Sequence, residues 1–431
     1  MKIGILTMFN GLGSIYSLVN VVSDHIRMLL DGGYAVKLLV SEDLNDNEKY
    51  GIYKDDRIEW AKICNRYKGQ QIIWRDYSSP NIKIHSDLME EAKAVGEDIA
   101  KNLEDVDICM MHDILYQGWH LVHNLAVIHA KELLPGMKFI AMTHSLPDET
   151  QVNNVVAWPH AARYQPLIDT LYVYPSSCGL KSLSRQYHVD IDKCRVLNNT
   201  LDLFQSMNAE IRTIHEMTDL LSPDILIIYP ARLTTGKRFE KVAMVAGALT
   251  RISRYKVKVI FCEYPSMDID ADLYKKSIRK AGTDYGLSNE DIVFTSDLGY
   301  PMGLSRNVIF DLFTLSNLYI CPSLSESFGL TLLEAASRGN YLVVNEAVPA
   351  LLELGKELEA YFLRWDAQNF GFSTQENYFP NELTYYEDHC KRIIMNMEHN
   401  PVIQAKMKVR KRYSPKWVFE NQLKPLLMEF M

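Results

Sequence analysis

The 431-residue sequence lacks the features that mark secreted, zinc-binding and membrane-spanning proteins. Its seven cysteines are scattered, odd in number and form no Cys-x-x-Cys pair, so neither a disulfide framework nor a zinc knuckle is indicated. No apolar run approaches the roughly 18 residues that cross a bilayer. The opening residues, MKIGILTMFNGLGS, predict a strand and a loop and not a signal peptide. We therefore expect a cytoplasmic protein.

The chain also lacks a net positive charge. A formal net charge of −8 at pH 7 argues against a general nucleic-acid binder, which needs lysine and arginine to neutralise phosphates. With 47% hydrophobic and 23% charged residues, the composition is typical of a globular enzyme or binding protein and not of a disordered chain. The length exceeds one ordinary core and predicts two large domains.

Short apolar runs alternate with segments of helical periodicity. In the first half the runs that predict strands are KIGILTMF, YAVKLLV, VDICMMH, KFIAMTH and TLYVYPSS. The alternation starts again at ILIIYPARL and continues through KVKVIFCEYP, DIVFTS, NLYICPS and YLVVNEA. Such alternation is typical of α/β folds with parallel sheets. We expect two Rossmann-like, doubly wound domains, residues 1–203 and 222–413, with a boundary near residues 204–224.

The stretch SLSESFGLTLLEAASRG places two glutamates around the start of a predicted helix. Glu326 lies in the loop, Gly329 at the first turn and Glu334 inside the helix. The N-terminus of a helix suits a phosphate, and a glycine there lets the ligand approach the backbone. Ionised carboxylates accept hydrogen bonds from pairs of hydroxyls, so the glutamates would flank the anion. A nucleotide-sugar has its groups in this order, whereas two solvent-exposed glutamates are the alternative.

A second segment, YPARLTTGKRF, carries two cations on a loop that contains a glycine. Arg232 and Lys237 follow a strand of the same predicted sheet as the two glutamates. Ligands of open α/β sheets bind at the carboxyl ends of the strands, where such cations can clamp a phosphate. Solvated loop charges are the alternative.

Together these segments resemble the retaining nucleotide-sugar glycosyltransferases of the GT-B fold, family four. ARLTTGK resembles their phosphate clamp, ESFGLTLLEA their Glu-seven-Glu motif and VLNNTLD their interdomain segment VIPNGVD. The resemblance covers most of the chain. It implies that the two domains face one another across a cleft that holds the chemistry, and that a C-terminal helix, 414–431, packs back on the first domain.

The resemblance assigns the donor site to the second domain. Glu326 would contact the donor hexose, and Glu334 would hold the ribose hydroxyls. Arg232 and Lys237 would take the diphosphate, so that no metal ion is required. The backbone N–H groups that would help to hold the hexose belong to Phe328, Gly329 and Leu330.

The resemblance also assigns residues of the first domain. Gly11 and Gly13 match the glycine loop under the donor phosphate and the acceptor, with a tight strand-to-helix turn as the alternative. His144 matches the histidine that lies against the donor sugar near the reacting carbon, with a structural histidine as the alternative. Further candidates to face the acceptor, from their position alone and not from the resemblance, are His112 and Asp113 at the end of another predicted strand, and Trp158.

The sequence departs from the family pattern in two places. Where the family commonly has Gly-Asp-Gly-Pro, this chain has the residues Cys262, Glu263, Tyr264 and Pro265. Thr200 stands where the interdomain segment has a glycine. Both departures leave the shape of the donor-side loops open.

The expected reaction moves a hexosyl unit from a UDP- or GDP-hexose to a hydroxyl acceptor with retention of configuration, without a cofactor. A GT-B phosphorylase or sugar epimerase, and a nucleotide-sugar-binding protein without activity, are the alternatives. The acceptor, the nucleotide and the oligomeric state stay open. The basic run KMKVRKRYSPKW, residues 406–417, would suit weak contact with an anionic membrane surface or would be a solvated helix.

Overall fold

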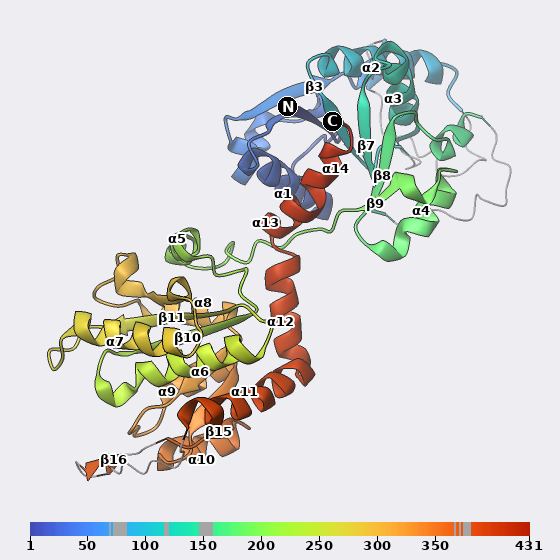
Figure 1. Cartoon of the computed structure of the whole chain (residues 1–431). Coiled ribbons are helices and arrows are strands. Elements are labelled where there is room, and N and C mark those ends of the chain that lie inside the picture. The colour runs from blue at the N-terminus through green and yellow to red at the C-terminus, as the bar shows by residue number, and fades with distance from the viewer. Residues whose placement is uncertain are drawn as a thin grey trace. The chain divides into compact units, whose positions relative to one another are not determined.

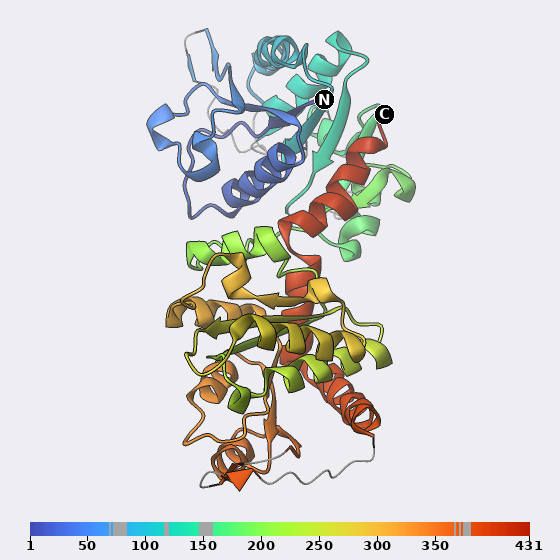
Figure 2. The same ribbon diagram turned by 60° about the vertical axis from the view of Figure 1, so that its left-hand side comes forward.

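The structure is a computed structural model that describes residues 1–68, 84–115, 120–145, 158–365 and 381–431, and the backbone of 70–71, 368–369 and 372–373. The chain divides into two compact units (Figures 1 and 2). Unit 1 consists of Met1–Thr200 and Pro415–Met431, and unit 2 of Leu201–Ser414. None of the helices described here is both long and apolar enough to span a lipid bilayer.

The sheet of unit 1 is parallel throughout and has the strand order β3-β2-β1-β6-β7-β8-β9. Side chains alternate between its faces, so that Ile3 and Ile5 join one core and Leu6 joins the other. The strands are β1 (Lys2–Leu6), β2 (Ala35–Ser41), β3 (Ile58–Ile63), β6 (Ile108–His112), β7 (Lys138–Met142), β8 (Thr170–Tyr174) and β9 (Cys194–Val196), with a small antiparallel pair, β4 (Arg66–Tyr67) and β5 (Gln70–Gln71).

Helices cover both faces of this sheet (Figure 1). One core packs against α2 (Leu88–Leu103) and α3 (Leu121–Leu133). The other packs against α1 (Ser17–Asp31) and the C-terminal segment with α13 (Pro415–Val418) and α14 (Lys424–Met428). A further helix, α4 (Leu180–Gln186), follows β8.

The C-terminal segment is an integral part of unit 1. Phe419 packs so closely on Gly32 that a Cβ there would lie 2.1 Å from its ring. The Arg195 guanidinium donates two hydrogen bonds to the Glu429 carboxylate, each 2.7 Å long. Unit 1 is therefore assembled from the two ends of the chain.

The sheet of unit 2 is also parallel, with the order β12-β11-β10-β13-β14-β15. Its strands are β10 (Ile225–Arg232), β11 (Val257–Tyr264), β12 (Ile292–Phe294), β13 (Leu318–Cys321), β14 (Tyr341–Asn345) and β15 (Tyr361–Leu363), and an antiparallel pair, β16 (Gln368–Asn369) and β17 (Phe372–Ser373), follows. Its helices are α5 (Ala209–Thr218), α6 (Phe239–Ile252), α7 (Ala271–Asp284), α8 (Arg306–Leu315), α9 (Leu330–Ser337), α10 (Pro349–Glu357), α11 (Glu382–His399) and α12 (Pro401–Arg412).

The topology confirms the predicted fold class, because each unit is a doubly wound α/β sheet of parallel strands. Every strand that the sequence predicts is present, and β3, β9 and β15 are added at sheet edges. The chain joins unit 2 at Leu201, and α5 buries Ile211 and Ile214 in the core of that unit. The strand order reverses between β1 and β6 in unit 1 and between β10 and β13 in unit 2, where open α/β sheets bind ligands.

Three side chains of the basic run on α12 are engaged within unit 2. Arg410 is 1% exposed and donates to the backbone oxygens of Leu315, Pro223 and Asp224 at 2.6, 2.5 and 2.8 Å. Lys406 donates to two carbonyls at the C-terminal ends of α8 and α9, where a helix favours a cation. Lys411 forms an ion pair with Asp224.

We predict that Arg410→Met lowers the free energy of unfolding of unit 2 by at least about 2 kcal/mol, because three buried carbonyls lose their donor. Lys408→Met, an exposed lysine on the same helix, should change it by less than about 0.5 kcal/mol. Urea-dependent hydrogen exchange of unit 2 peptides measures both values. Equal stability of the two variants would contradict the structural role of Arg410.

Candidate functional site

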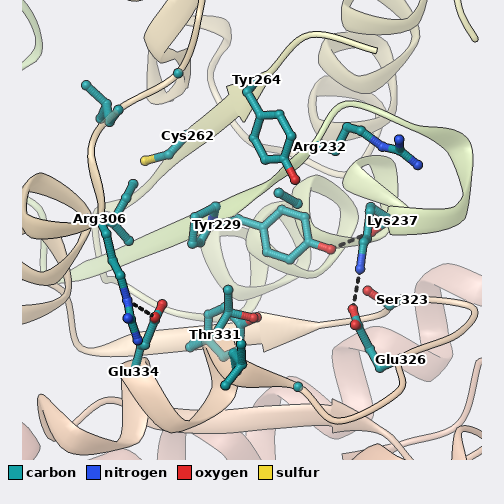
Figure 3. Close-up of a pocket in the computed structure, with 18 of the residues that line it drawn as sticks. Tyr229, Arg232, Lys237, Cys262, Tyr264, Arg306, Ser323, Glu326, Thr331 and Glu334 are labelled. Atoms are coloured by element: carbon teal, nitrogen blue, oxygen red, sulfur yellow. Dashed lines mark hydrogen bonds and ion pairs between the residues drawn. The ribbon is translucent and has the colours of Figure 1, made fainter. Parts of the chain in front are cut away.

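A pocket of about 440 Å³ opens at the carboxyl ends of β10, β11 and β13 in unit 2 (Figure 3). Its floor includes the phenol rings of Tyr229 on β10 and Tyr319 on β13, which lie on either side of the point where the strand order reverses. Tyr229 donates a hydrogen bond of 2.6 Å to the carbonyl of Lys237, and the Tyr319 hydroxyl lies 2.7 Å from Thr331 Oγ1. These bonds attach the loops of the pocket to the sheet.

Lys237 and Glu326 form an ion pair at one end of the pocket. Lys237 Nζ lies 2.5 Å from Glu326 Oε1, with 30% and 18% of the side chains exposed. The backbone of the two loops is also joined, since the Leu324 N–H donates to the Gly236 carbonyl at 2.9 Å. The ammonium group has three donors, so it can hold Glu326 and still donate to a ligand.

Glu334 lies at the other end of the pocket and is held by an arginine that the sequence analysis did not single out (Figure 3). Arg306 Nε donates to Glu334 Oε1 at 2.8 Å. The arginine is 70% exposed and the glutamate 12%. One carboxylate oxygen is therefore engaged by the protein, and Oε2 can accept a hydrogen bond from a ligand.

The N-terminus of α9 lies between these two ends. Gly329 precedes the helix with φ of 101° and ψ of 49°, a left-handed conformation that residues with a Cβ rarely adopt. The first N–H groups of a helix have no partner within it, and here they belong to the wall of the pocket. Phe328 and Leu330 flank the glycine, with 52% and 62% of their surfaces exposed.

The segment that departs from the family pattern forms the end of β11. Cys262 and Tyr264 line the pocket, whereas Glu263 faces away and is 2% exposed. Glu263 accepts hydrogen bonds from the backbone N–H groups of Thr295 and Ser296 at 3.1 and 3.3 Å. This carboxylate therefore holds the loop after β12 and is not available to a ligand in the pocket.

The predicted donor-site residues of unit 2 all belong to this one pocket. Arg232 at the end of β10 is exposed and lies above Lys237 in Figure 3. The predicted residues that line the pocket are Arg232, Lys237, Glu326, Phe328, Gly329, Leu330 and Glu334. Sequence reasoning missed Arg306, Tyr229 and Tyr319. Arg306 is the first residue of a helix and lies 28 positions before Glu334 in the sequence. No local sequence pattern predicts this ion pair.

The predicted residues of unit 1 lie at the carboxyl edge of its sheet. Gly11 and Gly13 belong to the loop between β1 and α1, where the intervening Leu12 N–H donates to Glu48 Oε2 at 3.0 Å. His144 follows β7 and is largely buried. Its backbone N–H donates to Asp113 Oδ1 at 2.7 Å.

His144 belongs to a group of three histidines. His112 Nδ1 lies 3.0 Å from His144 Nε2, and the ring of His25 on α1 lies 5.3 Å from the ring of His112. Burial lowers the pKa of His25 to about 3 and that of His112 well below its ordinary value. Within the residues described, no three or more His, Cys, Asp or Glu side chains are arranged to hold a metal ion.

Comparison with known proteins finds similarity in solved structures only. No protein-family model and no curated protein matches the sequence. Solved structures that match include a glycosyltransferase from Rickettsia africae at 15% identity and a TM-score of 0.36, covering 100% of this chain and 98% of that one. Anabaena HepE in complex with UDP and glucose matches at 14% identity and 0.35, covering 99% and 100%.

The galactosyltransferase WaaB of the lipopolysaccharide outer core matches at 13% identity and a TM-score of 0.38, with 100% of both chains covered. These names agree with the resemblance to glycosyltransferases. At such low identities and TM-scores the matches carry no argument about activity, which rests on the geometry of the pocket.

The buried histidines predict that unit 1 loses stability in acid. In the unfolded chain a histidine accepts a proton near pH 6.5, whereas folded His25 accepts one only near pH 3. The contribution of neutral His25 to the free energy of unfolding of unit 1 is complete above pH 6.5. Below that pH it falls by about 1.4 kcal/mol per pH unit down to about pH 3. In His25→Leu, the free energy of unfolding should fall less steeply as the pH is lowered, by about that slope. His399→Gln, at an exposed position, should keep the wild-type slope. Hydrogen exchange of unit 1 peptides between pH 7.5 and 4.5 measures the slopes, and parallel slopes for wild type and His25→Leu would contradict the assignment.

Proposed function

We propose that the protein is a glycosyltransferase that takes its sugar from a nucleotide diphosphate sugar bound in the unit 2 pocket. The observation that carries the proposal is the order of groups across that pocket. A lysine–glutamate pair lies at one end, an arginine–glutamate pair at the other, and the N-terminus of α9 between them. A nucleotide-sugar has hydroxyls at both ends and phosphates between.

The diphosphate fits the middle of the pocket. The free N–H groups at the start of α9 favour an anion, and the left-handed Gly329 brings the backbone close to it. Lys237 can donate to the diphosphate with the N–H groups that Glu326 does not use. Arg232 adds a second cation at the same end of β10. These positive groups stabilise the charge that develops on a leaving diphosphate, so that transfer requires no metal ion.

The two carboxylates fit the two sets of hydroxyls. Glu326 would accept from a hexose hydroxyl, and its bond to Lys237 couples sugar and diphosphate through one ammonium group. Glu334 would accept from a ribose hydroxyl through Oε2, because Oε1 is held by Arg306. Arg306 thereby orients the carboxylate toward the pocket.

The proposed chemistry is transfer with retention of configuration. The bond between the anomeric carbon and the diphosphate breaks, and the acceptor hydroxyl attacks from the same face. The acceptor proton passes to the leaving phosphate oxygen, which serves as the base. We assign the acceptor side of this reaction to unit 1, where the resemblance implies Gly11 and Gly13 under the donor phosphate and the acceptor and His144 against the donor sugar near the reacting carbon.

Two other functions would use the same anion site. A phosphorylase or a sugar epimerase would bind a phosphate or a nucleotide-sugar without passing the sugar from a nucleotide to a new hydroxyl. A binding protein would hold the nucleotide-sugar without turnover. Transfer ranks first because Lys237 contacts Glu326 and can also reach a leaving phosphate, an arrangement that binding alone does not require.

The test is a panel of UDP- and GDP-hexoses incubated with the full chain and a mixture of sugar acceptors, with release of each nucleoside diphosphate by transfer to an acceptor or to water followed over time. We expect release from one donor, retained in excess EDTA. Lys237→Met should lower kcat at least about a hundredfold, because a leaving group loses its cation, while the exposed Lys356→Met keeps the wild-type rate. No release from any donor would sink the proposal, and strict dependence on a divalent cation would remove the metal-free chemistry.

We also predict that Glu334→Ala weakens binding of the matching nucleoside diphosphate about 10- to 150-fold, since a hydrogen bond to a charged acceptor is worth about 1.5–3 kcal/mol. The exposed Glu353→Ala on α10 is the matched control and should bind as wild type. Titration calorimetry gives both constants. Wild-type affinity in Glu334→Ala would show that Glu334 does not hold the ribose.

A further inference from the structure

Unit 1 contains a hydrogen-bonded pair of neutral imidazoles. His112 ends β6, His144 follows β7, and their rings are nearly coplanar, with 4° between the planes. The bond joins His112 Nδ1 to His144 Nε2 at 3.0 Å. Two bare nitrogens cannot share a hydrogen bond, so one ring must donate to the other.

The outer nitrogens of the pair are buried and unpartnered within the described part of the chain. They are His112 Nε2 and His144 Nδ1. If His112 donates, His144 carries its proton on Nδ1 and offers a donor there. If His144 donates, its Nδ1 is bare and offers an acceptor. The direction of this one hydrogen bond therefore decides whether His144 Nδ1 is a hydrogen-bond donor or an acceptor.

The charge next to His144 selects between these two arrangements. The Asp113 carboxylate accepts from the His144 backbone N–H at 2.7 Å and from the Ser145 hydroxyl at 3.3 Å. Nδ1 is the ring nitrogen next to the backbone, so a negative charge anchored at this backbone N–H favours a proton on Nδ1 over one on Nε2. Asp113 holds this place in a left-handed conformation, with φ of 57°, which aspartate tolerates better than most residues.

We propose that His112 is a positioning residue that donates its Nδ1–H to His144 Nε2 and so keeps His144 as the Nδ1–H tautomer. His144 Nδ1, which is buried and has no partner among the described residues, then carries a proton that it can donate to an oxygen that reaches it. The commoner tautomer of a free neutral imidazole carries its proton on Nε2, so the pair reverses the intrinsic preference. The hydrogen bond at one ring nitrogen sets the proton at the other.

The ligand class follows from the donor. A fixed N–H suits an oxygen with free lone pairs, such as a sugar hydroxyl. That this oxygen belongs to a sugar in a transfer reaction rests on the proposed function. The tautomer itself rests only on the contacts within unit 1.

The test uses the full chain labelled with 15N-histidine, with signals assigned by single histidine variants. Long-range proton–nitrogen spectra should show His144 protonated on Nδ1 and a coupling across the bond to His112 Nδ1. In His112→Leu, the Nε2–H form of His144 should gain population, because only the Asp113 charge then favours the Nδ1–H form. In His112→Asn, the side-chain amide takes the place of Nδ1, so His144 should keep the wild-type tautomer. In His112→Gln, the amide takes the place of Nε2 instead, so His144 should have the same tautomer as in His112→Leu.

Kinetics give a second readout. His112→Leu should lower kcat on the order of ten- to a hundredfold with KM for the nucleotide-sugar within about twofold, and His112→Asn should restore most of kcat. An Nε2–H form of His144 in the wild type overturns the inference, and so does an unchanged tautomer in His112→Leu. If that variant fails to fold, the wild-type spectrum alone decides. A wild type with the expected tautomer but no transfer from any donor supports the inference and overturns the proposed function.

Discussion

Both parallel sheets of this protein are open, so the geometry of each candidate site depends on the place in the sheet where the strand order reverses. In unit 2 this place lies between β10 and β13. The loops that leave these two strands diverge to opposite faces of the sheet and leave a cavity between them. The loop after β10 supplies Lys237, and the loop after β13 supplies Glu326 and the start of α9. The ion pair and the helix N-terminus are both consequences of this reversal.

The charges of the unit 2 pocket are arranged in pairs. An unpaired carboxylate in a partly buried pocket is costly, and an unpaired ammonium likewise. Pairing Lys237 with Glu326 and Arg306 with Glu334 lowers that cost before a ligand arrives. It also fixes the orientation of both carboxylates, so that less side-chain entropy is lost when a ligand binds. The exposed Arg232 at the end of β10 is a further cation that can contact an incoming phosphate.

The sequence predicts every central strand and the edge strand β12, and it misses the other three edge strands for a physical reason. Central parallel strands such as β10 are covered on both faces and therefore appear as continuous apolar runs. The edge strand β3 has the mixed burial of a strand with one side open, and β9 and β15 have three residues each. None of the three produces an apolar run that stands out from loop sequence.

The same distinction applies to the site. Glu326, Gly329 and Glu334 were found because one turn of chain places them together, whereas Arg306 reaches Glu334 only through the packing of α8 beside α9. The histidine pair of unit 1 is likewise invisible in sequence, since His112 and His144 are 32 residues apart and meet because β6 and β7 are neighbours. Local motifs therefore point to candidate binding groups, and the topology decides which partners orient them.

The two units differ in the charges at the carboxyl edges of their sheets, and this difference suits them to different chemical groups. The unit 2 pocket combines cations, carboxylates and helix N–H groups, which suit a ligand with phosphate and hydroxyls. The edge of unit 1 contains imidazoles whose pKa values lie below their ordinary range, because burial disfavours the charged forms and, for His25 and His112, so does the neighbouring His144. A neutral N–H donor suits a hydroxyl, which carries no charge, whereas the charged groups of the unit 2 pocket suit an anion.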